Sequence, residues 1–155
     1  MGWVEDLRGK TVGLDTAPLI FYIEDHPIYA DLLAPLFEAV KSGETRLVTS
    51  TVTLLEVLVH PLKHGDERLA HAYNAILLSS PNIFTVPVTP ATAQTAAELR
   101  AVSKLKTPDA IHLATAINHR ADAFLSGDRD FGEFNLLRIL KIRDLASGAG
   151  IVPGH

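Results

Sequence analysis

The 155-residue chain contains no cysteine. This absence excludes disulfides, thiolate zinc sites, iron–sulfur clusters and cysteine nucleophiles. Basic residues are also few, because 14 Lys and Arg stand against 18 Asp and Glu and give a formal charge of −4. A protein that holds nucleic acid by bulk charge is expected to be basic. The balance argues against binding of that kind, unless the acids have a specific task.

Long apolar runs are missing as well. Residues 73–97 contain no Asp, Glu, Lys or Arg, but Pro81, Pro87 and Pro90 interrupt them. A membrane span needs about 20 mostly apolar residues without such breaks. The N-terminus shows no basic segment followed by an apolar one, as a secretory signal would. We therefore expect a cytoplasmic protein with no membrane segment.

The composition is that of an ordinary globular domain, with 47% hydrophobic and 21% charged residues. A chain of this length corresponds to about one domain. We expect a single domain over residues 1–155, with an N-terminal extension at 1–10. Small residues are common at the other end, which predicts a flexible tail at 146–155.

Short apolar segments alternate with patterns of helical period along the chain. The predicted strands are 11–15, 46–50, 83–86, 123–126 and 137–142. The predicted helices begin at Pro18 and then span 28–40, 52–62, 67–78, 90–103 and 107–118. Pro35 is expected to kink or divide the second helix. The alternation predicts the α/β class, with helices packed on a mostly parallel central sheet.

Acidic residues follow the predicted strands or open the predicted helices. Asp15 ends the first strand, Asp128 and Asp130 follow a later one, and Glu56 and Asp109 lie near the starts of helices. Because ligands gather at the carboxyl ends of parallel strands, we expect these side chains to share one edge of the sheet.

Each acid also has a simpler interpretation. Asp15 suits the cap of the helix that begins near Pro18. The segment from Thr53 to Glu56 matches a capping box, and Asp109 follows Thr107, a candidate helix cap, in a first turn where acids are favourable. Asp128 and Asp130 suit a turn. These interpretations explain the acids singly, but not why several of them come to one edge.

Clustered carboxylates repel one another, and burial raises the pKa of a carboxyl group. A hard divalent cation removes both costs, and oxygen ligands are those that Mg²⁺ and Mn²⁺ prefer. Without cysteine, an all-carboxylate site favours Mg²⁺ or Mn²⁺ over Zn²⁺. The sequence therefore predicts a site for one of these two ions.

Four segments resemble the motifs of PIN-domain ribonucleases, and of VapC-type toxins of toxin–antitoxin pairs in particular. The segments occur in the order of the family's motifs between about residues 11 and 142. They are Val12–Thr16 followed by Pro18–Ile20, then Thr49–Leu58, Thr107–Ala116 and Phe124–Phe131. The resemblance implies a three-layer α/β/α PIN-like fold.

The resemblance also assigns roles to residues. It implies that Asp15, Glu56, Asp109 and Asp128 are the catalytic, metal-binding acids, with Asp130 sharing or taking the fourth role. Two further residues, Thr16 and Ser126, stand where they would support the acids. Ala17 departs from the Asn or Ser common at its position, which removes an expected polar contact with substrate.

The implied activity is metal-dependent hydrolysis of RNA phosphodiester bonds with Mg²⁺ or Mn²⁺, without a protein nucleophile. Lys104, Lys106 and Arg129 lie near the third and fourth motifs and are candidates to contact RNA phosphates. His112 is one helical turn from Asp109 and either approaches the site or packs on the sheet. The family resemblance further implies a small antitoxin partner and a homodimer.

Two alternatives stay open at this point. One is a PIN-like module that binds RNA or protein without cleaving it. The other is a phosphoacceptor receiver domain, which also gathers acids at strand ends. A receiver should carry paired acids after its first strand, whereas Asp15 is solitary.

Overall fold

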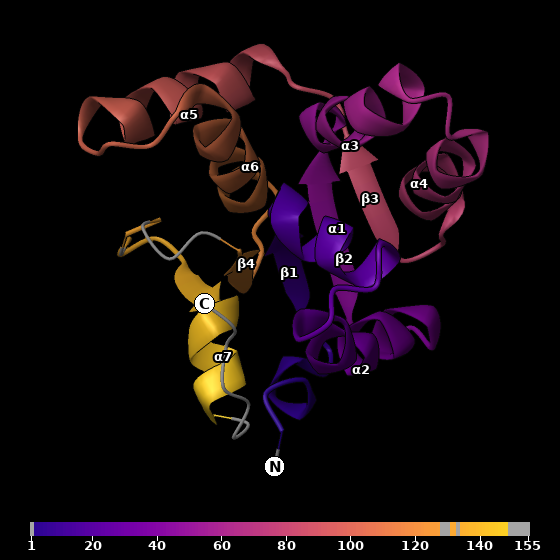
Figure 1. The fold of residues 1–155 in the computed structure, drawn as a ribbon. Helices are drawn as coiled ribbons and strands as arrows, with labels where there is room; N and C mark the ends of the chain where they lie inside the picture. The colour runs from indigo at the N-terminus through magenta and orange to yellow at the C-terminus, as the bar shows by residue number, and fades with distance from the viewer. Residues whose placement is uncertain (1, 128–130, 133, 149–155) are drawn as a thin grey trace.

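The structure, a computed structural model, describes residues 2–127, 131–132 and 134–148. Its centre is a five-stranded sheet in the order β3-β2-β1-β4-β5, and all four strand pairings are parallel (Figure 1). The strands are β1 (Thr11–Leu14), β2 (Arg46–Ser50), β3 (Ile83–Val86), β4 (Ala123–Ser126) and β5 (Arg138–Lys141). The predicted α/β class with a mostly parallel sheet is confirmed.

The strand order also tests the alternative of a phosphoacceptor receiver domain. Receiver-type folds have the order 2-1-3-4-5, whereas here the first three strands run β3-β2-β1 from one edge. The phosphoacceptor alternative is therefore wrong.

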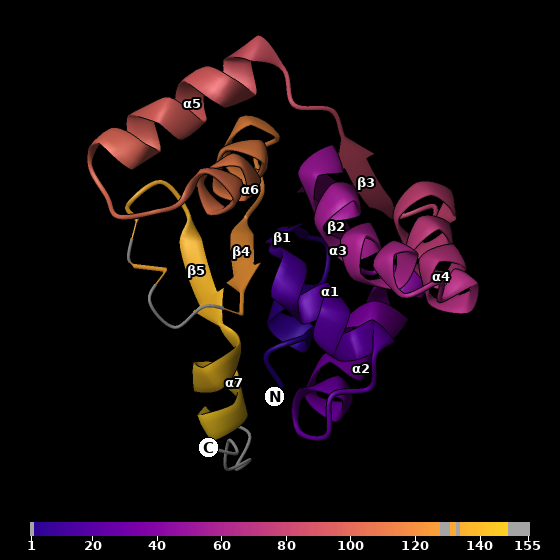
Figure 2. The same cartoon turned by 45° about the horizontal axis from the view of Figure 1, so that its top comes forward.

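Seven α-helices are present in the described part of the chain, and a short 3-10 helix (Glu5–Leu7) precedes β1. The helices are α1 (Thr16–Ile23), α2 (Tyr29–Lys41), α3 (Thr51–Lys63), α4 (Glu67–Ser79), α5 (Pro90–Ala101), α6 (Thr107–Asn118) and α7 (Ile142–Gly148). Helices α5 and α6 lie side by side, away from α4 (Figure 1 and Figure 2). Within the described residues, no helix is long and apolar enough to cross a membrane.

Two hydrophobic cores make the fold three-layered. Val12 and Leu14 of β1 belong to the core that contains residues of α1, α2, α3 and α4. Phe124 of β4 belongs to the second core, formed mainly by α5 and α6. Adjacent strand residues point to opposite faces of a sheet, so both faces are covered by helices, as a parallel sheet requires.

The layer of α6 lies very close to β1. A Cβ atom on Gly13 would come within 2.4 Å of Ala116 Cβ and 2.8 Å of Phe124 Cδ1. Only glycine allows this approach, which occurs at the last turn of α6. The close packing therefore fixes the C-terminal part of α6 against β1.

Several boundaries differ from those expected. The helix that contains Pro35 is not divided. Proline has no N–H to donate to the carbonyl of Asp31, but both residues lie on the exposed side of α2. Water can therefore form the hydrogen bond to that carbonyl. The last predicted strand ends at Lys141 and is followed by α7. Ala146 is buried in this helix, so the expected tail is helical through residue 148, and residues 149–155 lie outside the described part. Within the expected N-terminal extension, Leu7 is a core residue.

Candidate active site

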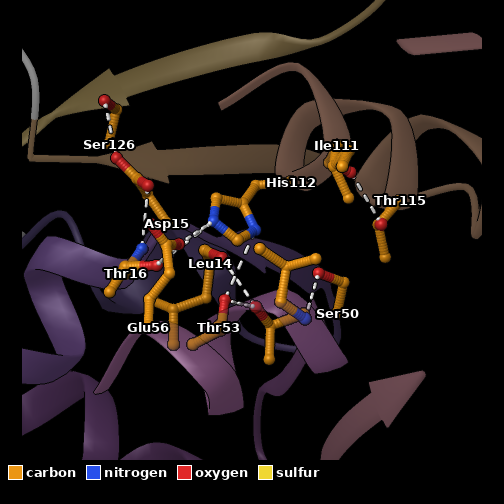
Figure 3. A network of polar contacts seen from close by, with 12 residues as sticks. Leu14, Asp15, Thr16, Ser50, Thr53, Glu56, Ile111, His112, Thr115 and Ser126 are labelled. Atoms are coloured by element: carbon orange, nitrogen blue, oxygen red, sulfur yellow. Dashed lines mark hydrogen bonds and ion pairs between the residues drawn. The ribbon is translucent and has the colours of Figure 1, made fainter. Parts of the chain in front are cut away.

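The candidate site lies where β1, β2 and β4 end and where α1, α3 and α6 begin. Asp15 directly follows β1, Ser50 ends β2, and Ser126 ends β4. Figure 3 shows Asp15, Thr16, Glu56 and His112 directed toward one another. The parallel sheet thus brings together residues that are far apart in the sequence.

Asp15 is buried, with 5% of its surface exposed. Its Oδ1 accepts a hydrogen bond of 2.8 Å from the Thr16 N–H, which caps α1 as the simpler interpretation predicted. Its Oδ2 accepts a bond of 3.4 Å from the Ser126 hydroxyl. Burial raises the pKa of Asp15, although the nearby His112 and backbone N–H groups of Thr16 and Gly127 counteract the rise. The ionised carboxylate therefore costs free energy, and a cation would offset this cost.

Glu56 is oriented by two neighbours. Its Oε1 lies 2.8 Å from Thr16 Oγ1 and 2.8 Å from His112 Nε2. The hydrogen bond with His112 is the main reason that the pKa of Glu56 is lowered; partial burial opposes this effect and the Thr16 hydroxyl adds to it. The carboxylate is thus held in its ionised form in one orientation.

Of the two positions predicted for His112, the structure shows the one close to the site, where its ring joins the network of polar contacts. The ring is 1% exposed, and Nε2 contacts Glu56 and, at 3.2 Å, Thr16 Oγ1. The other ring nitrogen, Nδ1, lies 3.3 Å from Thr53 Oγ1. Helical spacing from Asp109 gave a sequence signal for His112, but not its partners.

The capping-box interpretation of Thr53 and Glu56 is wrong. Helix α3 begins earlier, and its cap is Ser50, whose hydroxyl accepts a bond of 3.1 Å from the Val52 N–H. Thr53 is therefore inside the helix and fully buried. Glu56 is directed to Thr16 and His112 instead of the start of its own helix.

Asp109 lies in the first turn of α6. The expected cap, Thr107, is instead the first residue of the helix, and Lys106 holds the cap position without a side-chain bond. The hydroxyl of Thr107 accepts a bond of 2.9 Å from Arg100 Nη1, and Arg100 Nε donates to the Leu105 carbonyl at 3.0 Å. Arg100 thus fixes the connection that leads to Asp109.

One open cavity of about 430 Å³ unites these residues. It is lined by Asp15, Thr16, Ala17, Ile20, Glu56, Asp109 and Gly127. A Cβ atom on Gly127 would come within 2.5 Å of Ala17 Cβ. Ala17 therefore packs directly against Gly127, the first residue after β4.

Part of the predicted site cannot be placed, because it falls in a segment that the structure does not describe. Asp128, Arg129 and Asp130 lie outside them. In the ranges 2–127, 131–132 and 134–148, no three His, Asp or Glu side chains form a group that could hold a metal ion. Three carboxylates line the cavity, and such oxygen donors fit Mg²⁺ or Mn²⁺ in type.

The two lysines predicted to contact substrate are exposed. Lys106 caps α6, three residues before Asp109. Lys104 instead lines a different cavity of about 650 Å³, together with apolar residues that include Leu99, Phe131 and Leu136. The structure therefore places Lys106 at the start of the helix that carries Asp109, and Lys104 at a separate cavity.

Comparison with known proteins identifies the family. The model of the PIN domain family matches residues 12–136. The chain belongs to the PIN domain family. Among curated proteins, no relative matches significantly.

The chain is also similar in fold to solved structures of toxins. VapBC2 from Rickettsia felis, bound to a promoter DNA fragment, has a TM-score of 0.65 at 17% identity, covering 84% of this chain and 98% of that chain. VapC20 from Mycobacterium tuberculosis, a toxin that cleaves the sarcin-ricin loop, has a TM-score of 0.59 at 21% identity, covering 92% and 96%. A toxin–antitoxin complex from Klebsiella pneumoniae has a TM-score of 0.59 at 23% identity, covering 85% and 97%.

Proposed function

We propose that this protein is a metal-dependent endoribonuclease that hydrolyses RNA phosphodiester bonds and acts as the toxin of a toxin–antitoxin pair. The observation that carries the proposal is the convergence of Asp15, Glu56 and Asp109 on one cavity. A cap explains the bond between Asp15 and the Thr16 N–H. The cap does not explain why Glu56 of α3 and Asp109 of α6 line the same cavity as Asp15.

The proposed cofactor is Mg²⁺ or Mn²⁺. Asp15, Glu56 and Asp109 would hold it, together with Asp128 or Asp130. The burial that raises the pKa of Asp15 supports this choice, because a cation would stabilise the ionised form. When bound, such an ion supplies an activated water and neutralises charge on the scissile phosphate.

The chain's own residues would prepare the acids for this task. Thr16 serves two acids, because its N–H holds Asp15 and its hydroxyl holds Glu56. Ser126 holds the second oxygen of Asp15. Partners of this kind fix the orientation of metal ligands and raise metal affinity. We therefore keep, as part of the proposal, the supporting role that the family resemblance implies for Thr16 and Ser126.

The proposed substrate is RNA. Lys106, with its position directly before α6, would contact a phosphate of the RNA, and Lys104 and Arg129 would add further phosphate contacts. Such contacts depend on salt and do not select a base sequence. Bound cations would also offset the acids that make the chain negative overall.

The toxin role is supported by the similar solved structures, which include toxin–antitoxin complexes from Rickettsia felis and Klebsiella pneumoniae. A small antitoxin protein is the proposed partner. Expression of this chain alone in a bacterial host should arrest growth, and expression with its antitoxin should restore it. A short reading frame next to the gene is the first place to look for that antitoxin.

A homodimer is the proposed assembly. Leu55, Val59 and Leu62 are exposed by 63%, 55% and 67%, and their spacing places them on one face of α3. Exposed apolar side chains that cluster on one helix face mark an interaction surface. We assign this face to a second copy of the chain.

The decisive experiment incubates the purified protein with single-stranded and stem-loop RNAs, in Mn²⁺ and in EDTA. Cleavage in Mn²⁺ alone, lost in Asp109→Asn, supports the proposal. Asp31→Asn is a matched control, because Asp31 is also an acid in the first turn of a helix but is exposed in α2. If the protein binds Mn²⁺ and cuts none of these RNAs, the result favours the alternative of a PIN-like module that binds RNA or protein without cleaving it.

A further inference from the structure

Two threonine hydroxyl groups form a chain of contacts that leads to Nδ1 of His112, the ring nitrogen that does not face Glu56 (Figure 3). Thr49 Oγ1 is 3.0 Å from the Leu14 carbonyl oxygen and 2.7 Å from Thr53 Oγ1. Thr53 Oγ1 in turn is 3.3 Å from Nδ1 of His112. Thr49, Thr53 and His112 are all buried. These contacts connect the last residue of β1 to the ring that holds Glu56.

The directions of these hydrogen bonds follow from the atoms at the end of the chain. A carbonyl oxygen only accepts, so the single hydroxyl hydrogen of Thr49 goes to Leu14. The short contact between the two threonines then takes the hydroxyl hydrogen of Thr53. The oxygen of Thr53 has no hydrogen left for His112 and must accept from it. Nδ1 of His112 is therefore the donor in its contact with Thr53, and Nε2 is the donor to Glu56, because a carboxylate oxygen only accepts.

We propose that Thr49 and Thr53 are positioning residues that act through His112 on Glu56. By accepting the hydrogen on Nδ1, Thr53 fixes the orientation of the ring and directs Nε2 to Glu56 Oε1. The inference rests on the proposed function only for its metal-binding measurement.

The behaviour of Thr115 shows why packing alone does not account for Thr53. A buried threonine inside a helix commonly donates to the carbonyl one turn earlier, and Thr115 does so, with its Oγ1 2.7 Å from the Ile111 carbonyl oxygen. Thr53 is equally buried, yet its hydroxyl contacts two side chains, Thr49 and His112. Its hydroxyl is thus committed to the network around the acids.

The first measurement uses the metal-free wild-type protein at neutral pH. A nitrogen-15 spectrum of the histidine side chains should show a hydrogen on Nδ1 of His112 that exchanges slowly with water. A His112 ring without a hydrogen on Nδ1 would overturn the proposal. This result requires no variant, no metal and no RNA.

The second measurement compares Mn²⁺ affinity by calorimetry in three variants. Thr53→Val removes the hydroxyl and should weaken Mn²⁺ binding about tenfold, as the loss of partners behind metal ligands commonly does. Thr53→Ser keeps the hydroxyl and should restore the wild-type affinity. Thr115→Val removes a buried hydroxyl one helical turn from His112 and should leave the affinity unchanged.

The outcomes separate the two proposals. Equal Mn²⁺ affinity in Thr53→Val and the wild type would overturn the positioning role, as would equal losses in Thr53→Val and Thr115→Val. If Thr53→Val fails to fold, the wild-type spectrum still decides. If the wild type binds no Mn²⁺, the proposed nuclease function fails, and the spectrum alone decides the role of the hydroxyls.

Discussion

Nε2 of His112 lies 2.8 Å from Oε1 of Glu56. This contact ties α6 to α3 at the acid cavity, across 56 residues of sequence. It is the largest cause of the lowered pKa of Glu56. The state and orientation of one acid therefore depend on a residue outside the acid set.

Replacement of His112 by Gln should raise the pKa of Glu56 toward its ordinary value of 4.5. An amide can still donate a hydrogen bond, but it lacks the charge that favours the carboxylate. Carbon-13 spectra of the carboxyl groups, recorded against pH without metal, measure the change. An unchanged or lower pKa of Glu56 would contradict this reading of the contact.

Asp15→Asn should stabilise the metal-free protein. The substitution removes a buried charge whose pKa is raised by burial, and Asn retains the capping of α1. A gain of about 1 kcal/mol would raise the melting temperature by about 2–4 °C in a chain of this size. Thermal unfolding in EDTA measures the change in melting temperature. A variant that melts below the wild type would contradict the claim that the buried charge of Asp15 costs stability.

The same pKa shift predicts a pH dependence. A carboxyl with a raised folded-state pKa binds more protons in the folded than in the unfolded state, so its contribution to stability falls as pH rises. That contribution is complete below the ordinary value of 3.8 and is lost as pH rises through the folded-state pKa. The stability advantage of Asp15→Asn over the wild type in urea unfolding should therefore grow between acid and neutral pH. A constant difference would show that Asp15 is not perturbed.

The positions of the acids were predictable because their elements are strongly patterned. Parallel apolar strands end at one edge of a sheet, and this rule predicts from the sequence that Asp15, Glu56 and Asp109 lie close together. The cap of α3 was harder to predict than its start, which differs from the expected residue by one. Ser50, Thr51 and Thr53 are all plausible caps from the sequence. In the structure Ser50 is the cap, and the hydroxyl of Thr53 contacts Thr49 and His112 instead.

His112 illustrates a different limit. Its spacing from Asp109 follows from helical geometry, but its partner Glu56 comes from another helix, and no periodicity reveals a contact between them. Helix α7 was missed because it is short and follows β5 without an intervening turn. Its stability comes from packing, as the burial of Ile142 and Ala146 shows.

Gly127→Ala should destabilise the protein and reduce activity. The new methyl group would meet Ala17 Cβ at 2.5 Å, and overpacking of this kind costs about 1–3 kcal/mol. Ala17→Gly should recover part of the loss in the double variant, since it removes the atom in the way. Urea unfolding of the four proteins measures the coupling, and additive effects would contradict a direct clash.

Leu62→Glu should convert the proposed dimer to a monomer, because it places a charge in the exposed apolar face of α3. Light scattering after size-exclusion chromatography measures the mass. Val102→Glu is the control, as Val102 is 82% exposed at the end of α5, outside that face. A wild type that is monomeric at every concentration would contradict the assignment of this face to a second copy.

The central claim is that the acid cavity cleaves RNA with a bound divalent cation. The most direct measurement follows RNA cleavage by the wild type and Asp15→Asn as Mn²⁺ is titrated into metal-free protein. We predict cleavage that rises with Mn²⁺ in the wild type and is absent in Asp15→Asn, although the variant remains folded. Cleavage that persists in Asp15→Asn, or that does not depend on Mn²⁺, would contradict the account.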